Sequence, residues 1–515
     1  MKKFIKGTLL LTIGGFICKF IGAFFRIPLA NILGATGMGY YQMVFPIYSF
    51  ALVFVSGGIP ATLSRFVSQS RANGDYGKVK KYFFYAIKIS LLIGIFFAII
   101  FLIFAKRISL LQGVENVYRG YYIIALTIIF SSILCAFRGL FQGFENMLPT
   151  FFSQIFEQIF KMIFGILFAV LLVGYGAEYG FLGALIGICL SEIISFIYLL
   201  IYTFMFNKKT KFFSHLYSTC VIEKNKFLRF SVPITLTSLV LPLLAVVSSL
   251  LVVNLLTSNG LSNITSTAVY GIQSGMINSI ISFPTVISTA LATSLLPLLA
   301  YKIEKNEKKE AEESIKNCLK IVWILAFPCM VGLYVLAPNV LQIAFNNAIV
   351  DELFDVATNM MQISSLSILF ICIVQISTVM LQAMKKQWQA FVSLMLLFVS
   401  NIFFLILFIK TNGVYGMSLA SLLSYSISSL LNLVLISKFC NIKMRFFDLS
   451  IPILSSIIMG IICSQLKVLL KNFNVYISTI FIVFIGILIY FLPVFLFKVL
   501  SFKNLIFGLK EKQKN

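Results

Sequence analysis

The sequence predicts an all-α polytopic membrane protein with 14 transmembrane helices, arranged as two parallel six-helix lobes plus two C-terminal helices. Three observations predict this fold class: an apolar composition, the spacing of apolar runs and an internal repeat. Of the 515 residues, 60% are hydrophobic and only 11% are charged. A soluble domain is roughly 45–50% apolar and about a quarter charged, because its surface has to be polar. The composition therefore excludes a soluble enzyme.

Polar and charged breaks divide the chain into fourteen apolar runs, and a helix needs about 20 apolar residues to cross ~30 Å of hydrocarbon. The predicted spans are residues 7–33, 39–64, 82–105, 119–143, 147–172, 179–206, 230–256, 267–300, 319–342, 356–384, 388–410, 413–437, 449–466 and 476–498. The first run imitates a signal peptide, but it continues past Lys19 without a cleavage site, so we interpret it as a span. Pro284 and Pro297 predict a kinked or tilted helix in the eighth span.

The positions of the positive charges predict the orientation. The chain has 41 Lys and Arg against 17 Asp and Glu, a formal net charge of +24. With the N-terminus inside, thirty of the cations fall in inside segments, six in outside loops and five within spans. This alternation follows the positive-inside rule and predicts that both termini are cytoplasmic. The basic loops then face anionic lipid, and we predict no nucleic-acid partner.

An internal repeat predicts the two lobes. When the chain is shifted by 240 residues, the segment that begins at Leu140 overlies the segment that begins at Met380, and Phe151 overlies Phe391. Spans 4–6 then resemble spans 10–12, which predicts two parallel bundles around a central cavity. The predicted organisation is an N-lobe (1–206), a basic cytoplasmic linker (207–229), a C-lobe (230–437), two further spans (438–498) and a cytoplasmic basic tail (499–515).

Cysteine and histidine usage gives no metal or disulfide signal. The nine cysteines are scattered singly and His215 is the single histidine of the chain. Without a CxxC pair or a Cys/His cluster, these residues are typical of small core positions. We expect no metal and no cofactor.

Charged residues at membrane depth are concentrated in the predicted N-lobe. A charge there costs roughly 2.5–3.5 kcal/mol or more and usually faces a cavity or a partner. The N-lobe spans contain seven such residues, with a summed charge of +3: Lys19, Arg26, Lys88, Arg138, Glu157, Lys161 and Glu192. The positions that the repeat matches to Glu157 and Lys161 are Leu397 and Asn401. Any polar site is therefore expected in the N-lobe.

These residues predict a site for an anion. Lys19 lies about thirteen residues beyond Lys6, ~20 Å into the membrane, and Arg26 follows it two helical turns later on the same face. Glu157 and Lys161 form an i,i+4 pair, which Arg138 approaches through a short connection. Arg and Lys hold phosphate by charge-assisted bonds that strengthen in a low dielectric. Other interpretations exist for some of these residues. Arg26 could snorkel, the Glu157–Lys161 pair could join helices, and Glu192 could be a proton or cation site or the partner of an arginine.

Several separated motifs resemble the stage V sporulation protein B-like family. The motifs are Lys19-Phe-Ile-Gly-Ala-Phe-Phe-Arg26-Ile-Pro, Gly39-Tyr-Tyr-Gln42 with Phe45-Pro46, Ser56-Gly-Gly-Ile-Pro60-Ala-Thr-Leu-Ser64-Arg65, Phe137-Arg138-Gly-Leu-Phe-Gln142-Gly, Pro149-Thr, Ser153-Gln154-Ile-Phe-Glu157-Gln158-Ile-Phe-Lys161, and the segment from Phe283-Pro284-Thr285 to Pro297. This family belongs to the polysaccharide-transporter branch of the multidrug/oligosaccharidyl-lipid/polysaccharide flippase superfamily and is related to the lipid II flippases.

The resemblance implies a V-shaped cavity worked by alternating access, with the last two spans shaping a groove for a lipid tail. It implies transport of undecaprenyl-pyrophosphate-linked saccharide from the inner to the outer leaflet of a bacterial plasma membrane. Lys19 and Arg26 match two cations that contact the head group, and Arg138, Glu157 and Lys161 match polar positions of spans 4 and 5. Where relatives have an acid late in span 7, this chain has Ser248-Ser249. We therefore predict no cation site in the C-lobe.

The sequence is compatible with a flippase for a lipid-linked saccharide, and an exporter and a scaffold are the other classes of function to compare with it. The leading hypothesis is a flippase for the peptidoglycan precursor lipid II, with Lys19, Arg26, Arg138, Glu157, Lys161 and Glu192 as the substrate-binding residues. The alternatives are a flippase for a capsule or other polysaccharide precursor, and a cation-coupled multidrug exporter, which the net positive charge disfavours. A membrane scaffold is contradicted by the charges at membrane depth. We expect coupling to the membrane potential or a cation gradient, and membrane lipids as further partners. The oligomeric state stays open.

Overall fold

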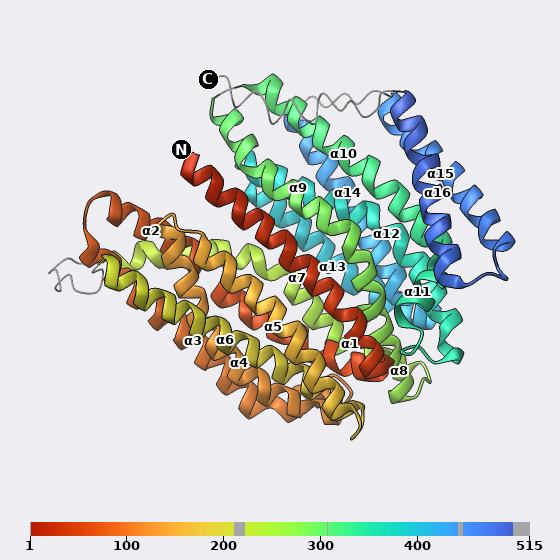
Figure 1. Cartoon of the computed structure of the whole chain (residues 1–515), viewed down its shortest axis with the longest axis horizontal. Coiled ribbons are helices and arrows are strands. Elements are labelled where there is room, and N and C mark those ends of the chain that lie inside the picture. Colours follow the sequence, from red (N-terminus) through yellow and green to blue (C-terminus); the bar gives the residue numbers. More distant parts are fainter. Residues whose placement is uncertain (1, 211–221, 306, 441–445, 498–515) are drawn as a thin grey trace. The chain divides into compact units, whose positions relative to one another are not determined.

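The computed structural model describes residues 2–210, 222–305, 307–440 and 446–497, and the described residues contain helices and no strand (Figure 1). The predicted basic tail and the middle of the predicted linker, which includes His215, lie outside the described residues. The helices are α1 (Lys2–Ser56), α2 (Ile59–Ala72), α3 (Tyr76–Leu111), η1 (Glu115–Val117), α4 (Tyr118–Gly143), α5 (Leu148–Val173), α6 (Ala177–Thr210), α7 (Lys224–Ser258), α8 (Asn263–Gly271), η3 (Ile272–Ile277), α9 (Asn278–Glu304), α10 (Lys308–Val335), α11 (Ala337–Phe345), α12 (Asp351–Ala383), α13 (Gln387–Asn412), η4 (Gly413–Tyr415), α14 (Gly416–Phe439), α15 (Phe446–Leu469) and α16 (Val475–Leu496).

The helices agree with the predicted spans. Within the described residues, twelve helical runs are long and apolar enough to cross a membrane. Two of them, Gly14–Ala72 with 59 residues and Gln387–Phe439 with 53, each contain two predicted spans. Counted in this way, every one of the fourteen predicted spans has a helix. The run predicted to kink at its prolines contains a π-helical segment, η3, ahead of Pro284.

The two spans within α1 are separated by Gly34. Its backbone is not helical, with φ 68° and ψ 178°. An α-helix of 55 residues would be about 80 Å long at 1.5 Å per residue, far more than a bilayer's thickness. A positive φ of this kind suits glycine, which has no Cβ to clash with the following carbonyl. The glycine thus allows one continuous run to supply two spans.

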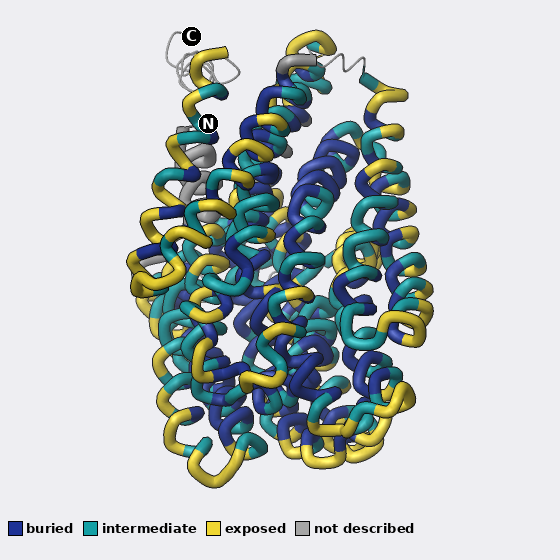
Figure 2. Tube along the Cα trace, turned by 90° about the vertical axis from the view of Figure 1, so that its right-hand side faces the viewer, coloured by how far each residue is buried: buried dark blue, intermediate teal, exposed yellow. Residues whose placement is uncertain are grey.

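The surface of several helices is apolar, as a lipid environment requires. In α16, the exposed side chains include Ile477, Ile480, Phe484, Leu488 and Leu492, which are between 53% and 71% exposed. Such a stripe on a water-soluble protein would drive association. Figure 2 shows exposed residues along the lengths of helices as well as at the loops between them. The protein is therefore a multi-pass membrane protein whose helices expose apolar residues along their length.

The chain divides into two compact units, which are described separately. The first comprises residues 1–280 with the short segments 347–350 and 409–414, and the second comprises the remaining residues. The first unit thus includes α7 and α8 together with α1–α6, because α1 packs against both of them. The predicted lobe boundaries at residues 207–229 stay a prediction about the repeat.

Two glycines of α6 bring it against α5 inside the first unit. A Cβ on Gly187 would lie 2.2 Å from the backbone nitrogen of Gly165, and one on Gly183 would lie 2.2 Å from the carbonyl oxygen of Phe168. Backbones approach this closely only where side chains are absent. This packing fixes α5 and α6 side by side, and both carry predicted site residues.

The internal repeat is visible in the backbone. Glu145 follows α4 and Lys385 follows α12, and they have φ of 58° and 62° although neither is glycine. The two positions are 240 residues apart, which is the predicted shift. Three backbone hydrogen bonds recur at the same spacing: Phe144 N to Leu140 O, Glu145 N to Gln142 O and Asn146 N to Phe141 O, against Met384 N to Met380 O, Lys385 N to Gln382 O and Lys386 N to Leu381 O. This is a Schellman ending in both copies, and it confirms the register.

Candidate functional site

The six predicted site residues all belong to the first compact unit. Lys19 and Arg26 lie on α1, Arg138 lies on α4, Glu157 and Lys161 lie on α5, and Glu192 lies on α6. These four helices contact one another: α1 packs against α4, α5 and α6, and α6 packs against α4 and α5. The fold therefore gathers the predicted residues, and the side-chain contacts divide them into separate groups.

The first group joins α4 to α5 through an ion pair. Nη2 of Arg138 donates to Oε2 of Glu157 at 2.8 Å, and Nε of Arg138 donates to Oγ of Ser153 at 2.8 Å. The amide of Gln158 donates to the other oxygen, Oε1, of Glu157 at 3.1 Å. The Arg138 and Glu157 side chains are 14% and 20% exposed. The planar guanidinium thus bonds two acceptors at once, which fixes its orientation.

The expected i,i+4 pair between Glu157 and Lys161 is wrong. Glu157 pairs with Arg138 instead, and no ion pair joins Lys161 to any acid in the described part of the chain. The physical reason is the short connection after α4, which brings the Arg138 fork to the carboxylate. Gln158, the next residue on α5, occupies the second oxygen. Lys161 therefore lies against aromatic rings instead of against a carboxylate.

The second group consists of two cations on one aromatic ring. Nζ of Lys161 lies 4.8 Å from the centre of the Phe45 ring, and Cζ of Arg26 lies 5.9 Å from the same centre. Nζ of Lys161 is also 5.6 Å from the Phe25 ring. Both cations are half-buried, and neither has an acidic partner within 4 Å among the described residues. A cation–π contact is worth about 0.5–2 kcal/mol, less than the cost of burying a charge. The pair therefore favours an added anion.

Lys19 lies apart from both groups. It is exposed on α1, seven residues before Arg26 on the same helical segment that ends at Gly34. Seven residues are close to two turns, so both residues are on one side of α1, about 10 Å apart along the axis. No described acid forms an ion pair with Lys19. Its role in binding stays a prediction.

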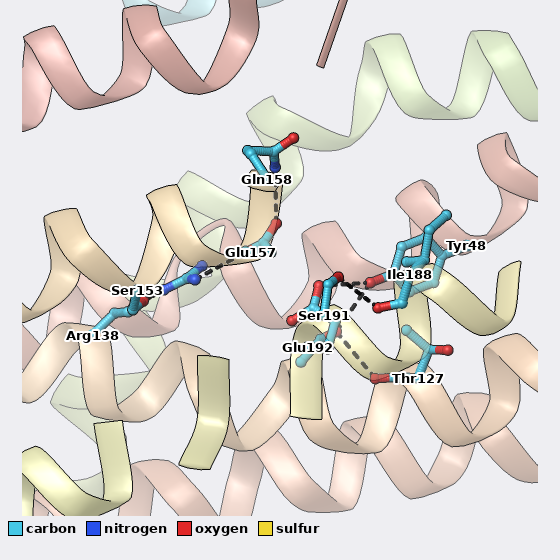
Figure 3. Close-up of polar contacts among 10 residues, drawn as sticks. Tyr48, Thr127, Arg138, Ser153, Glu157, Gln158, Ile188, Ser191 and Glu192 are labelled. Atoms are coloured by element: carbon cyan, nitrogen blue, oxygen red, sulfur yellow. Dashed lines mark hydrogen bonds and ion pairs between the residues drawn. The ribbon is translucent and has the colours of Figure 1, made fainter. Parts of the chain in front are cut away.

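The third group is centred on Glu192 and is the most deeply buried. Glu192 is 5% exposed, and its Oε1 accepts a hydrogen bond from the hydroxyl of Tyr48 at 3.1 Å. The Tyr48 hydroxyl also lies 3.0 Å from Oγ of Ser131, which in turn donates to the carbonyl of Thr127 at 3.1 Å. Figure 3 shows this group apart from the group of Arg138 and Glu157. Glu192 thus contacts neutral hydroxyls and not a site cation.

The sequence motif that contains Tyr41 and Phe45 was noted, but sequence reasoning gave the aromatic residues that connect these groups no role at the site. Tyr41, Phe45 and Tyr48 follow one another on a single face of α1; the first two rings stack with centres 5.4 Å apart, and the Phe45 and Tyr48 centres are 6.2 Å apart. Their i, i+4, i+7 spacing is the signal that could have found them. Ser131 carried no comparable signal, because a hydroxyl in an apolar span is common.

Residues that could hold a metal are not gathered in the described part of the chain. No group of three or more His, Cys, Asp or Glu side chains is close enough to hold an ion there. Ser249, where relatives were expected to have an acid, is buried and accepts a hydrogen bond from the amide of Gln112 at 3.2 Å. The predicted lack of a cation site in the C-lobe stays a prediction.

The sequence is similar to known transporter families and to curated flippases. The profile of the family described as polysaccharide biosynthesis protein matches residues 4–301, more than half of the chain, and the MatE profile matches residues 233–407. The stage V sporulation protein B of Bacillus subtilis (strain 168) is 24% identical over 355 residues, 67% of each chain. The lipid II flippase MurJ of the same organism is 30% identical over 161 residues, 30% of each chain. The probable low-salt glycan biosynthesis flippase Agl15 of Haloferax volcanii is 25% identical over 222 residues, 42% of this chain and 46% of the relative.

Solved structures show the same fold. A lipid II flippase MurJ in an inward closed conformation has a TM-score of 0.70 at 18% identity, covering 97% of this chain and 100% of the other. An inward-facing multidrug resistance MATE family transporter has a TM-score of 0.68 at 13% identity, covering 84% and 98%. The relatives named for an activity are flippases, which are transporters and not enzymes. The chain belongs to the polysaccharide biosynthesis protein family.

Proposed function

We propose that the protein is a flippase that moves an undecaprenyl-pyrophosphate-linked saccharide from the inner to the outer leaflet by alternating access. The peptidoglycan precursor lipid II is the leading substrate. The family and its flippase relatives support the class of substrate. The observation that carries the proposal for this chain is the pair of half-buried cations, Arg26 and Lys161, which share the Phe45 ring.

The chemistry of this pair suits a pyrophosphate. Two cations without an acidic partner repel each other in a low dielectric, and an anion between them removes that repulsion. The Arg26 guanidinium presents a planar fork that matches two phosphate oxygens, and the Lys161 ammonium adds a point charge. Lys19 extends the positive charge along α1 toward the saccharide.

The ion pair of Arg138 and Glu157 has a different role in this proposal. Its charges compensate each other, so it offers little net attraction to an anion. It holds α4 to α5 and thereby positions Lys161, which lies one turn after Glu157. A pyrophosphate that reaches Arg138 competes with Glu157 for the guanidinium. If the pyrophosphate replaces Glu157, the ion pair between α4 and α5 is broken, so substrate binding changes how these two helices are held together.

The membrane potential supplies a driving force for this direction of transport. We propose that the protein lies in the bacterial plasma membrane with both termini cytoplasmic. A negative interior favours the outward movement of an anionic head by about 2.3 kcal/mol per charge per 100 mV. Single-cysteine labelling with an impermeant reagent, in a background without the native cysteines, tests the orientation. The loops 70–80 and 302–316 should be protected from outside and 347–355 should react; outside labelling of 302–316 would contradict the orientation.

Two experiments test the function. Purified protein should bind a pyrophosphate-linked polyprenyl lipid, and inorganic pyrophosphate should compete for the same site. In a strain depleted of its own flippase, the chain should restore growth, with a labelled wall precursor reaching the outer leaflet. Binding of the pyrophosphate-lipid without rescue would favour a capsule or other polysaccharide precursor as the substrate.

A cation-coupled multidrug exporter is the second candidate, and the MatE profile match to residues 233–407 favours it. A site for lipophilic cations needs acids that face the substrate. Glu157 is already paired with Arg138, and Glu192 is bonded to Tyr48. Binding of a lipophilic cation in preference to the pyrophosphate-lipid would replace our proposal with this one.

A further inference from the structure

Glu192 is a buried acid that the proposed transport of an anion does not use. It is 5% exposed, and the hydroxyl of Tyr48 is its hydrogen-bond partner from a neighbouring helix. Among the described residues of α1, α4, α5 and α6, no cation forms an ion pair with Glu192. An ionised carboxylate removed from water without a cation costs several kcal/mol. Some ligand has to neutralise it.

The groups that face Glu192 come from the three helices packed against α6. From α1 there is Tyr48; from α4 there are Ser131, Cys135 and Arg138; from α5 there are Glu157 and Lys161. The Arg138 charge is compensated by Glu157 at 2.8 Å. Lys161 is held at the Phe45 and Phe25 rings. The nearby charges therefore leave Glu192 without a partner of its own.

The number of hydrogens available for the hydrogen bonds around Glu192 favours the protonated, neutral form of its carboxyl group. Glu192, Tyr48, Ser131 and the Thr127 carbonyl form a row of four oxygens with three contacts of 3.1, 3.0 and 3.1 Å. If Glu192 is protonated, each contact has its own hydrogen: the carboxyl donates to Tyr48, Tyr48 to Ser131 and Ser131 to Thr127. If Glu192 is ionised, two hydrogens serve three contacts and one contact is unmade. The neutral acid therefore makes one more hydrogen bond than the ionised acid, which is worth about 0.5–1.5 kcal/mol.

We propose that Glu192, with Tyr48 and Ser131, forms a proton-binding site that is separate from the Arg26–Lys161 pair and exchanges a proton during transport. The proton is exchanged between the Glu192 carboxyl and water, so that only O–H bonds are formed and broken, and the hydroxyls of Tyr48 and Ser131 reorient as Glu192 gains or loses it. An alkali cation is the other ligand that neutralises a carboxylate. It needs several oxygen ligands, and the described partners here are hydroxyls that already bond one another.

The position of Tyr48 connects this site to the two cations, a step that rests on the proposed function. The Tyr48 ring lies against Phe45, with centres 6.2 Å apart, and Phe45 carries both Arg26 and Lys161. Loss of the proton turns the Tyr48 hydroxyl into the donor for an ionised Glu192. The same loss adds a negative charge near Lys161 and weakens the hold of Lys161 on an anion. Proton release and substrate release then occur together.

Infrared spectroscopy tests the proton site without any substrate. Purified protein in lipid nanodiscs should show the carbonyl band of a protonated carboxylic acid at neutral pH, and Glu192→Gln should remove that band. Ser191→Ala is the matched control, because Ser191 is the adjacent buried residue and its hydroxyl bonds the carbonyl of Ile188 in its own turn. The control should keep the band. Tyr48→Phe keeps the acid and should shift the band, which makes the test valid even if Glu192→Gln does not fold.

Two outcomes would overturn the proposal. Absence of the band in the native protein at neutral pH would show that Glu192 is ionised. Loss of the band on adding sodium chloride, and its return in choline chloride, would establish an alkali-cation site. The link to transport is measured separately: binding of pyrophosphate-lipid should change the proton occupancy of the native protein and not that of Glu192→Gln. A protein that shows the band and fails to bind the lipid would refute the proposed function and leave the proton site standing.

Discussion

The connection between α4 and α5 and the connection between α12 and α13 share one backbone and differ in chemistry. Both helix pairs meet at the same Schellman ending, 240 residues apart. In the first copy, the guanidinium of Arg138 bridges Ser153 and Glu157. In the second copy, the corresponding positions are Thr378, Ser393 and Leu397.

Neutral hydrogen bonds take the place of the ion pair in the second copy. Ser393 Oγ lies 2.9 Å from Ser428 Oγ of α14, and the Asn432 amide donates to Thr378 Oγ1 at 3.5 Å. Leu397 is fully buried, and Asn401, which corresponds to Lys161, is 5% exposed. Since the second copy builds the same turn without an ion pair at the corresponding positions, the ion pair of the first copy is not needed for the turn itself. Charge that the fold does not require is a candidate for function.

The largest expected effect is on transport, and it should be confined to the first compact unit. Lys19→Ala and Arg26→Ala should each abolish transport of the pyrophosphate-lipid while the amount of protein in the membrane stays unchanged. Asn401→Leu, at the position that corresponds to Lys161, should leave most of the transport. The measurement is transport of labelled precursor, normalised to membrane protein. Equal losses from both copies would refute an anion site in the first compact unit.

The next largest effect is on stability and uses the residues of the second copy as replacements. Glu157→Leu alone should lower the free energy of unfolding by about 3 kcal/mol, because it leaves the Arg138 charge buried without its partner. Adding Arg138→Thr should recover most of that loss, because no charge then remains. Denaturation of the purified variants in one detergent measures both values. A double variant that is less stable than Glu157→Leu would show that the first copy needs its charges to fold.

The transmembrane helices could be predicted from the sequence because apolar length and loop charge determine them locally. All fourteen spans have helices, and the turns at Glu145 and Lys385 confirm the repeat register. The approach of Arg138 through the short connection was predicted and is confirmed, but the sequence did not show that Arg138, and not Lys161, pairs with Glu157. The i,i+4 spacing on α5 made Lys161 a plausible partner for Glu157, but the fold brings Arg138 there with better geometry.

The group around Glu192 was even less predictable. A buried acid in a span indicates a functional site, and three roles stayed open for it. The sequence does not tell which hydroxyls from distant segments reach the carboxylate, because Tyr48 and Ser131 are 144 and 61 positions away from it. Only the packing of α1 and α4 on α6 brings them together.

A smaller effect is expected on the affinity for substrate, and it distinguishes a role of Arg26 and Lys19 in binding from a role in folding. Arg26→Gln and Lys19→Gln should each weaken binding of the pyrophosphate-lipid by about 2 kcal/mol, the range for a desolvated charge-assisted bond. Arg26→Lys keeps the charge without the planar fork and should keep part of the binding. Since neither residue pairs with a described acid, stability without substrate should stay unchanged. Arg138→Gln is the contrast, because it strands Glu157 and should lower stability. Unchanged affinity in Arg26→Gln with a large loss of stability would remove Arg26 from the site.

The smallest effect concerns the shared turn. A residue other than glycine at φ near +60° costs about 1 kcal/mol, and both copies place a charged residue there. Lys385→Gly should therefore raise the free energy of unfolding by up to about 1 kcal/mol, because the 3.6 Å contact of Lys385 with Glu304 joins two exposed side chains and contributes little. Glu145→Gly should gain less, because Glu145 also forms a 3.0 Å ion pair with Arg71 of α2. Lys385→Ala and Glu145→Ala remove the same charges without relieving the backbone, so they isolate the glycine effect. If glycine and alanine behave alike at both positions, the two copies do not share a strained turn and the repeat is weaker than the backbone indicates.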